Sequence, residues 1–159
     1  MTDTECTIRP AGAGDVPAVG RLWQSMADQH AGYDAEAWCY RPDARQRWCE
    51  EFAGFLAQAD RVLLVAEQAG QIVGFTVCAV EEPLVELSRR CGVVREVVVA
   101  EASRGRGIAT LLMEAAFEAM KALGAEEVVL HAAIDNAAAV GLYEKLGMRR
   151  TMYRMVRTL

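Results

Sequence analysis

Several features that would assign a protein to a broad class are missing from this sequence. No apolar run in the 159 residues approaches the roughly 18–20 residues of a membrane-spanning helix. The first ten residues, MTDTECTIRP, lack the basic and then apolar layout of a secretory signal peptide. The net charge of −5 argues against a surface for nucleic-acid phosphates and suits cationic substrates better. These absences predict a cytoplasmic protein with neither a membrane nor a nucleic acid as partner.

Paired cysteines are missing as well. The five cysteines form an odd set and contain no C-x-x-C pair, which predicts reduced thiols and no zinc or other metal site. Repeats, linkers and low-complexity stretches are also absent. The length suits one domain with a substantial core, so we expect a single domain over residues 1–159.

Hydrophobic periodicity divides the chain into helices and strands. In the first half, Asp15 offers an N-cap with Pro17 in the first helical turn, and Gly32 interrupts the apolar pattern that follows. The runs at 61–67 and 72–80 are typical of a β-hairpin. The order of elements predicts a mixed α/β or α+β protein with helices on both faces of one sheet. The remaining expected elements are strands at 5–9, 93–100, within 124–133 and at 148–159, and helices at about 15–30, 43–59, 107–123 and 135–147.

The stretch RGRGIAT (104–110) follows the apolar strand 93–100 and opens a helix. The first backbone N–H groups of a helix have no partner inside it and lie at the positive end of its dipole. Glycines let a phosphate approach the backbone closely, so a glycine-rich turn at a helix mouth favours an anion. The amides from about Arg106 to Thr110 could therefore converge on a pyrophosphate, with Arg104 and Arg106 adding positive charge.

Two familiar nucleotide motifs fit this turn poorly. A Walker loop requires a lysine that is missing here, and a dinucleotide fingerprint requires a third glycine where Thr110 stands. Taken alone, the stretch is also compatible with a tight turn between strand and helix whose arginines are simply solvated.

Three segments together resemble the GNAT superfamily of N-acetyltransferases. RGRGIA (104–109) resembles that family's R/Q-x-x-G-x-G/A loop for acyl-coenzyme A. DNAAAVGLYEKLGM (135–148) is similar to its later asparagine-led helix, and IRPAGAGDVPAVGRLW (8–23) looks like its first strand and helix. Two departures put the exact shape of the loop in doubt: AEAS (100–103) replaces a common proline, and Met148 replaces a common phenylalanine.

The resemblance implies a fold and a reaction. The fold is a central, mostly antiparallel twisted sheet, splayed between the strand at 93–100 and the strand at 127–133, with helices on both faces. The reaction moves an acetyl group from acetyl-CoA, as co-substrate, to a primary amine by direct attack while both substrates are bound. The acceptor is then a small cationic amine or a peptide amine, namely a protein N-terminus or a lysine. A homodimer stays open, since dimers are common among similar proteins.

The resemblance also implies which residues bind the cofactor. The turn at 104–110 would hold the pyrophosphate, and the backbone of the preceding strand would pair with the pantetheine arm. Asn136 and Tyr143 are seven residues apart and so share one helical face; in similar enzymes the asparagine contacts the cofactor and the tyrosine hydroxyl lies near the sulfur. The expected cofactor-binding residues are Val97, Val98, Val99, Arg104, Gly105, Arg106, Gly107, Ile108, Ala109, Thr110, Asn136 and Tyr143.

Tyr143 and Glu96 are the expected catalytic residues. A phenol has a reference pKa near 10, so neutral Tyr143 can donate a proton to a departing thiolate. Glu96 is the only acid in the run 93–100, and it could bind the substrate ammonium or draw off its proton through water. Glu96, His30 and Tyr33 are the expected substrate contacts. Acids in segments that could rim the acceptor site are Asp28, Asp34, Glu36, Glu81, Glu82 and Glu86.

Each of these residues also has an ordinary structural explanation. Tyr143 could be a packed core aromatic, Asn136 a helix N-cap, and Glu96 one partner of an ion pair. At the level of the whole chain, the alternatives are a CoA-binding regulatory module without turnover and a small interaction domain with a fortuitous turn.

Overall fold

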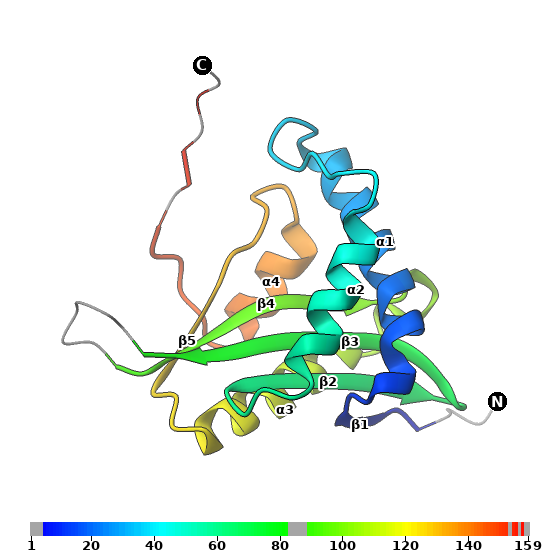
Figure 1. Ribbon diagram of the computed structural model, residues 1–159. Helices are drawn as coiled ribbons and strands as arrows, with labels where there is room; N and C mark the ends of the chain where they lie inside the picture. The colour runs from blue at the N-terminus through cyan, green and yellow to red at the C-terminus, as the bar shows by residue number, and fades with distance from the viewer. Residues whose placement is uncertain (1–4, 83–88, 153, 156, 158–159) are drawn as a thin grey trace.

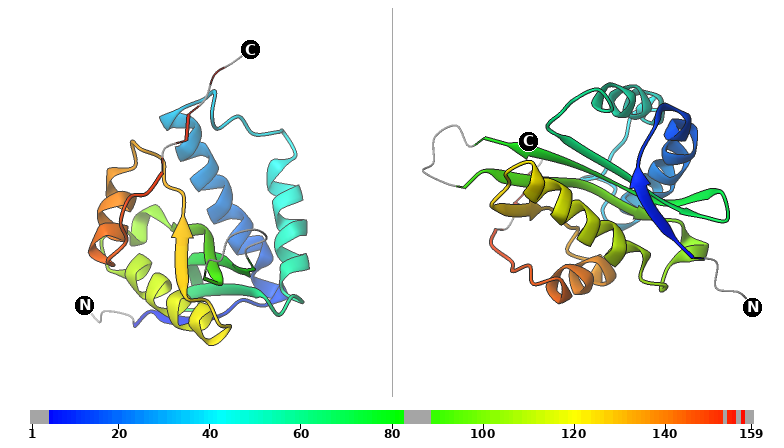
Figure 2. Two further views of the ribbon diagram at one scale, coloured as in Figure 1. Left: turned by 90° about the vertical axis from the view of Figure 1, so that its left-hand side faces the viewer. Right: turned by 90° about the horizontal axis from the view of Figure 1, so that it is seen from below.

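The computed structural model describes residues 5–82, 89–152, 154, 155 and 157. Five strands form one sheet in the order β1-β2-β3-β4-β5. All neighbours are antiparallel except β4 and β5, which are parallel. Helices α1 and α2 cover one face of the sheet, while α3 and α4 lie on the other (Figure 1, Figure 2). This arrangement confirms the predicted mixed sheet with helices on both faces.

The first half of the chain supplies one edge strand and two helices. β1 spans Thr7–Pro10, a short 3-10 turn (η1) spans Ala13–Asp15, and the helices are α1 (Val16–Tyr33) and α2 (Ala44–Phe55). Asp15 occupies the N-cap position as expected, but its carboxylate accepts hydrogen bonds from Arg9 and from the backbone N–H of Gly12. Pro17 lies in the first turn of α1, where its missing N–H has no intrahelical role.

The second half builds the rest of the sheet. A tight turn at Ala69 and Gly70, both with positive φ, joins the two strands of the expected hairpin. The fourth strand leads through a second 3-10 turn (η2, Glu101–Ser103) into the third helix. The elements are β2 (Arg61–Gln68), β3 (Gln71–Glu81), β4 (Cys91–Val99), α3 (Ile108–Ala122), β5 (Glu127–Leu130) and α4 (Ala137–Lys145).

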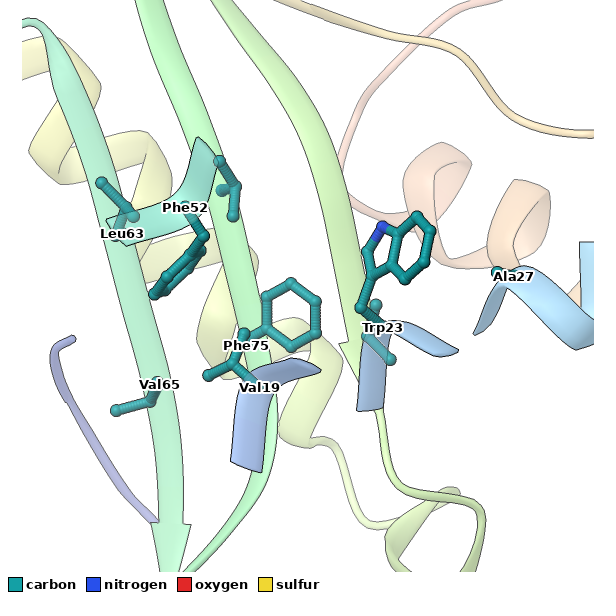
Figure 3. Packing of buried hydrophobic residues seen from close by; sticks show 9 residues of the cluster. Val19, Trp23, Ala27, Phe52, Leu63, Val65 and Phe75 are labelled. Atoms are coloured by element: carbon teal, nitrogen blue, oxygen red, sulfur yellow. The ribbon is translucent and has the colours of Figure 1, made fainter. Parts of the chain in front are cut away.

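Apolar side chains pack on both faces of the sheet. Between the sheet and the first two helices lies an aromatic-rich cluster, in which Trp23 of α1, Phe52 of α2 and Phe75 of β3 are buried (Figure 3). The opposite face packs against α3 through Leu112, Met113 and Met120, with smaller residues around them. The inner side of α2 carries Trp48, Phe52 and Phe55, which together with Leu56 at its C-cap belong to the aromatic-rich cluster. Among the described residues, no helix is long and apolar enough to cross a membrane.

Three expectations about the elements are wrong. The first helix continues through Gly32 to Tyr33, since one glycine weakens a helix without ending it. The strand expected up to residue 133 ends at Leu130, where its pairing with β4 stops. The described part of 148–159 forms no strand; Met152 and Met155 are 82% and 92% exposed, and their odd spacing cannot give one apolar face with a period of two. Tyr153, Val156 and the last two residues of that run lie outside the described residues.

Candidate active site

A cavity of about 430 Å³ opens where β4 and β5 separate. The two strands pair only from Cys91 to Val94 on β4 and from Glu127 to Leu130 on β5. Beyond that point β4 continues to Val99, paired only with β3 among the described residues, while the chain after β5 turns away. The expected splay is therefore present, and it leaves one edge of the β4 backbone facing the cavity.

A β-bulge in β4 decides which way its side chains point. Val77 of β3 lies opposite Glu96, but the next residue, Cys78, lies opposite Val94, so Arg95 is an extra residue without a partner of its own on β3. Such an insertion shifts the alternation of the strand by one position. Val94 consequently packs on the α3 side, whereas Glu96 contacts α2.

Glu96 lines the cavity in an unusual electrostatic setting. Its Oε1 accepts a hydrogen bond of 3.1 Å from the indole N–H of Trp48, and its Oε2 is buried without a hydrogen-bond partner among the described residues. Burial raises the pKa of this carboxyl from 4.5 to about 7, against the opposing effects of the Trp48 hydrogen bond and of Arg95. A carboxyl with such a pKa can exchange a proton near neutrality.

The glycine-rich turn has the geometry of an anion site. Gly105 and Gly107 have φ of +75° and +77°, and a Cβ added at either would meet nothing within 4 Å, so both face open space. Gly107 is the N-cap of α3, whose first N–H groups have no acceptor within the helix. Arg104 is held in place by the Val99 carbonyl and the side chain of Gln29. A coenzyme A pyrophosphate therefore fits the residues present here.

Helix α4 contributes the opposite wall of the cavity. The side chain of Asn136 accepts a hydrogen bond from the N–H of Ala139, so the residue is the N-cap of α4 and also lines the cavity. Tyr143 lines the cavity as well, and burial raises the pKa of its phenol above 10. Tyr143 is thus a neutral proton donor at any physiological pH.

The structure brings most of the predicted site residues together. Apart from Arg106 and Tyr33, every expected cofactor or substrate contact lines the cavity: His30, Glu96, Val97, Val98, Val99, Arg104, Gly105, Gly107, Ile108, Ala109, Thr110, Asn136 and Tyr143. Arg106 is exposed within the same turn. Tyr33 lies near the end of α1, where its hydroxyl accepts a hydrogen bond from the amide of Gln29.

Of the acids expected at the site, only Glu96 is found in the cavity lining. Glu96 is the only acid among the described lining residues, whereas Asp28, Asp34, Glu36, Glu81 and Glu82 do not line the cavity, and Glu86 lies outside the described residues.

Other functional candidates were not found by the sequence patterns. His131, expected inside a strand, lies just past β5 on the cavity wall. Met26, Gln29 and Trp48 were missed because they read as ordinary helix residues, and only their contacts across the fold give them a place at the site. No group of three or more His, Cys, Asp or Glu among the described residues could hold a metal ion.

His30 is packed rather than free. Its ring stacks on Trp38 with centroids 4.5 Å apart, and its Nδ1 is buried without a partner among the described residues. Burial lowers the pKa of this imidazole below 6.5, so the ring is mostly neutral at pH 7. A neutral ring at the cavity wall can contact a substrate without repelling a cation.

Comparison with known proteins agrees with the geometry. Residues 23–148 match the model of the acetyltransferase (GNAT) family. N-alpha-acetyltransferase 30 of Schizosaccharomyces pombe is 33% identical over 96 residues, which is 60% of this chain and 63% of that protein. This chain thus matches about three fifths of the length of that relative.

Solved structures share the fold. A mutant of the BH1408 protein from Bacillus halodurans superimposes with a TM-score of 0.85 at 24% identity, over 96% of this chain and 99% of that one. The aminoglycoside N-acetyltransferase AAC(6')-Iy, solved in complex with CoA, has a TM-score of 0.78 at 17% identity, over 98% and 95% of the two chains. Because the family model matches residues 23–148, which is most of this chain, the chain belongs to the acetyltransferase (GNAT) family.

Proposed function

We propose that this protein is an acyltransferase that moves the acetyl group of acetyl-CoA to a primary amine, with both substrates bound in the cavity between β4 and β5. The observation that carries the proposal is the placement of a glycine-rich helix mouth, a neutral phenol and a carboxyl with a pKa of about 7 around one cavity. GNAT acetyltransferases use acetyl-CoA, and the thioester supplies the activated acetyl group.

The cofactor would be held mainly by backbone groups. The amides at the start of α3 and the side chains of Arg104 and Arg106 neutralise the pyrophosphate. The free edge of β4 between Val97 and Val99 pairs with the amides of the pantetheine arm, while the valine side chains pack in the core on either side. Holding the thioester beside the amine makes the attack effectively intramolecular, which contributes several kcal/mol.

Two side chains would then move the protons. Glu96 accepts a proton from the substrate ammonium, directly or through water, so that the nitrogen lone pair becomes free to attack. Tyr143 donates its phenolic proton to the leaving sulfur when the carbon–sulfur bond breaks, and the second proton of the attacking nitrogen, released as the amide forms, returns to the phenolate through water. Both groups are in the required protonation state above about pH 7, since Glu96 is then ionised and Tyr143 is neutral.

The acceptor is either a small cationic amine or a peptide amine. The net charge of −5 and the acidic Glu96 favour a cation in both cases. The similarity to an N-alpha-acetyltransferase supports a protein N-terminus as the first acceptor to test.

Calorimetric titration with acetyl-CoA tests the cofactor, with Gly107→Val beside the wild type. We expect micromolar binding by the wild type and none by the variant, because a side chain on Gly107 would project into the open space at the helix mouth, where the proposed phosphate would lie. Valine is also strained at this positive φ, so Gly70→Val, at φ +74° in the β2–β3 turn, is the matched control. Absence of binding by the wild type would refute the enzyme, and binding without release of CoA thiol from any amine would favour the regulatory module.

A further inference from the structure

The two carboxylate oxygens of Glu96 have different surroundings. Oε1 accepts the 3.1 Å hydrogen bond from the Trp48 indole, while Oε2 is buried and lacks a hydrogen-bond partner among the described residues. A buried acceptor without a partner is costly, and such groups often mark a place where a ligand binds. Oε2 is therefore the carboxylate oxygen without a hydrogen-bond partner, on a residue that lines the cavity.

The Trp48 indole is itself fixed by other rings. It stacks between Trp23, at a centroid distance of 5.5 Å, and Phe52, at 5.2 Å, and it lies tilted against Phe75 at 5.5 Å. Trp23 and Phe52 come from two different helices, and both are buried in the core (Figure 3). A ring held by three others has one orientation, so its N–H points in one direction.

The backbone of Glu96 is fixed as well. The hydroxyl of Thr76, which is fully buried on β3, donates a hydrogen bond of 2.9 Å to the Glu96 carbonyl oxygen. The bulge at Arg95 turns the Glu96 side chain toward α2. Backbone and carboxylate are therefore constrained independently, by β3 and by α2.

We propose that Trp48 is a positioning residue: its indole N–H anchors Oε1 of Glu96, so that Oε2 is presented to the amine in the cavity. An indole N–H is a donor only, so it always favours the ionised carboxylate over the protonated acid. Keeping the carboxylate ionised is what the proposed function needs from a base. The inference rests on that function for the amine and for the kinetic test, whereas the Trp48–Glu96 contact can be tested without it.

The other charged and titratable groups around Glu96 do not replace this contact. Arg95 points to Glu51 and Glu81 at the outer surface, and it contributes less than the Trp48 hydrogen bond to lowering the Glu96 pKa. Burial raises the pKa of Tyr40 and of Cys78, so neither is ionised at neutrality. On the cavity walls, His30 has its pKa lowered by burial, and His131 and Tyr143 come from the far side of the splay.

The first test follows the indole itself and needs no turnover. The chain has three tryptophans, so a proton–nitrogen correlation spectrum contains three indole signals, and Trp48→Phe identifies the one of interest. We expect the Trp48 signal to shift with pH, with an inflection at about 7, and to lose that inflection in Glu96→Gln. An indole signal that does not respond to pH, or that responds equally in Glu96→Gln, overturns the proposal.

The second test uses the pH dependence of kcat/KM. Trp48→Phe keeps a ring in the stack and removes the donor, so the acidic limb should move upward by roughly one pH unit, as expected for a hydrogen bond to a charged group. Trp23→Phe alters the same stack but leaves the indole donor on Trp48, so its acidic limb should move less than that of Trp48→Phe. If the acidic limb of the kcat/KM profile lies at the same pH in the wild type and in Trp48→Phe, the proposal is overturned.

The two tests separate the possible failures. If the wild type shows no turnover with any amine, the proposed function fails while the indole titration still decides on the Trp48–Glu96 contact. If Trp48→Phe does not fold, as shown by loss of its thermal transition, the titration of wild type against Glu96→Gln decides in the same way.

Discussion

The two walls of the cavity are built in different ways. The cofactor wall, defined as residues 104–110 and the start of α4, presents mostly backbone groups, glycines and a helix mouth. The acceptor wall, defined as Glu96 with the α1 and α2 residues around it, presents side chains whose positions depend on an aromatic stack. In the proposed function, the cofactor wall would recognise the pyrophosphate common to every acyl-CoA, whereas the acceptor wall could change with the amine while the fold stays the same.

Because the two walls differ in this way, we expect substitutions on the acceptor wall to lower kcat/KM the most. Glu96→Gln keeps the shape and the indole hydrogen bond but removes the base, so we expect kcat/KM to fall about 10³-fold, within the usual range for acid–base groups. Acetyl-CoA affinity should stay at the wild-type value. Glu51→Gln makes the same change on a carboxylate that lies outside the cavity lining, and it should retain full activity. A higher KM for the amine with an unchanged kcat would assign Glu96 to ammonium binding alone.

The same substitution should stabilise the protein at alkaline pH. Since the fold raises the pKa of Glu96 from 4.5 to about 7, its contribution to stability is full below pH 4.5 and is lost as pH rises through 7. Above that range, Glu96→Gln should be more stable than the wild type by up to about 3 kcal/mol, at about 1.4 kcal/mol for each unit of pKa. Urea unfolding at acidic and alkaline pH measures the difference. Equal stability at alkaline pH would mean that the carboxylate is solvated.

The same contrast explains what the sequence could predict. The cofactor wall comes from short contiguous motifs, so RGRGIAT and the asparagine-led helix identified nearly all of its residues. The acceptor wall joins Trp48 to Glu96 across 48 positions, and a bulge at Arg95 sets the direction of the glutamate. Neither a bulge nor a ring stack between two helices has a local signature. The described part of 148–159 forms no strand because its exposed methionines, Met152 and Met155, do not keep a period of two.

Tyr143 tests whether the α4 side takes part in chemistry or only in binding. Tyr143→Phe removes the proton donor and keeps the packed ring, so we expect kcat to fall roughly 10²-fold with unchanged acetyl-CoA affinity. Single-turnover kinetics and calorimetry measure the two quantities. Tyr33→Phe makes the same change on a tyrosine outside the cavity lining, and it should retain the wild-type kcat and acetyl-CoA affinity. Wild-type turnover in Tyr143→Phe would leave this tyrosine a packing role only.

The smallest expected effect comes from alanine substitutions at two glycines. They separate the backbone role of a glycine from a role in binding acetyl-CoA. Gly107 and Gly70 have nearly equal φ, +77° and +74°, and an added Cβ meets nothing within 4 Å at either. Alanine at either position should therefore cost a similar 1–2 kcal/mol or so of stability, the usual strain of a left-handed residue. Only Gly107→Ala should also weaken acetyl-CoA binding, by about tenfold, because only its methyl group lies at the helix mouth. Equal loss of affinity in both variants would trace the effect to general destabilisation, and unchanged affinity in both would place the pyrophosphate elsewhere on the cofactor wall.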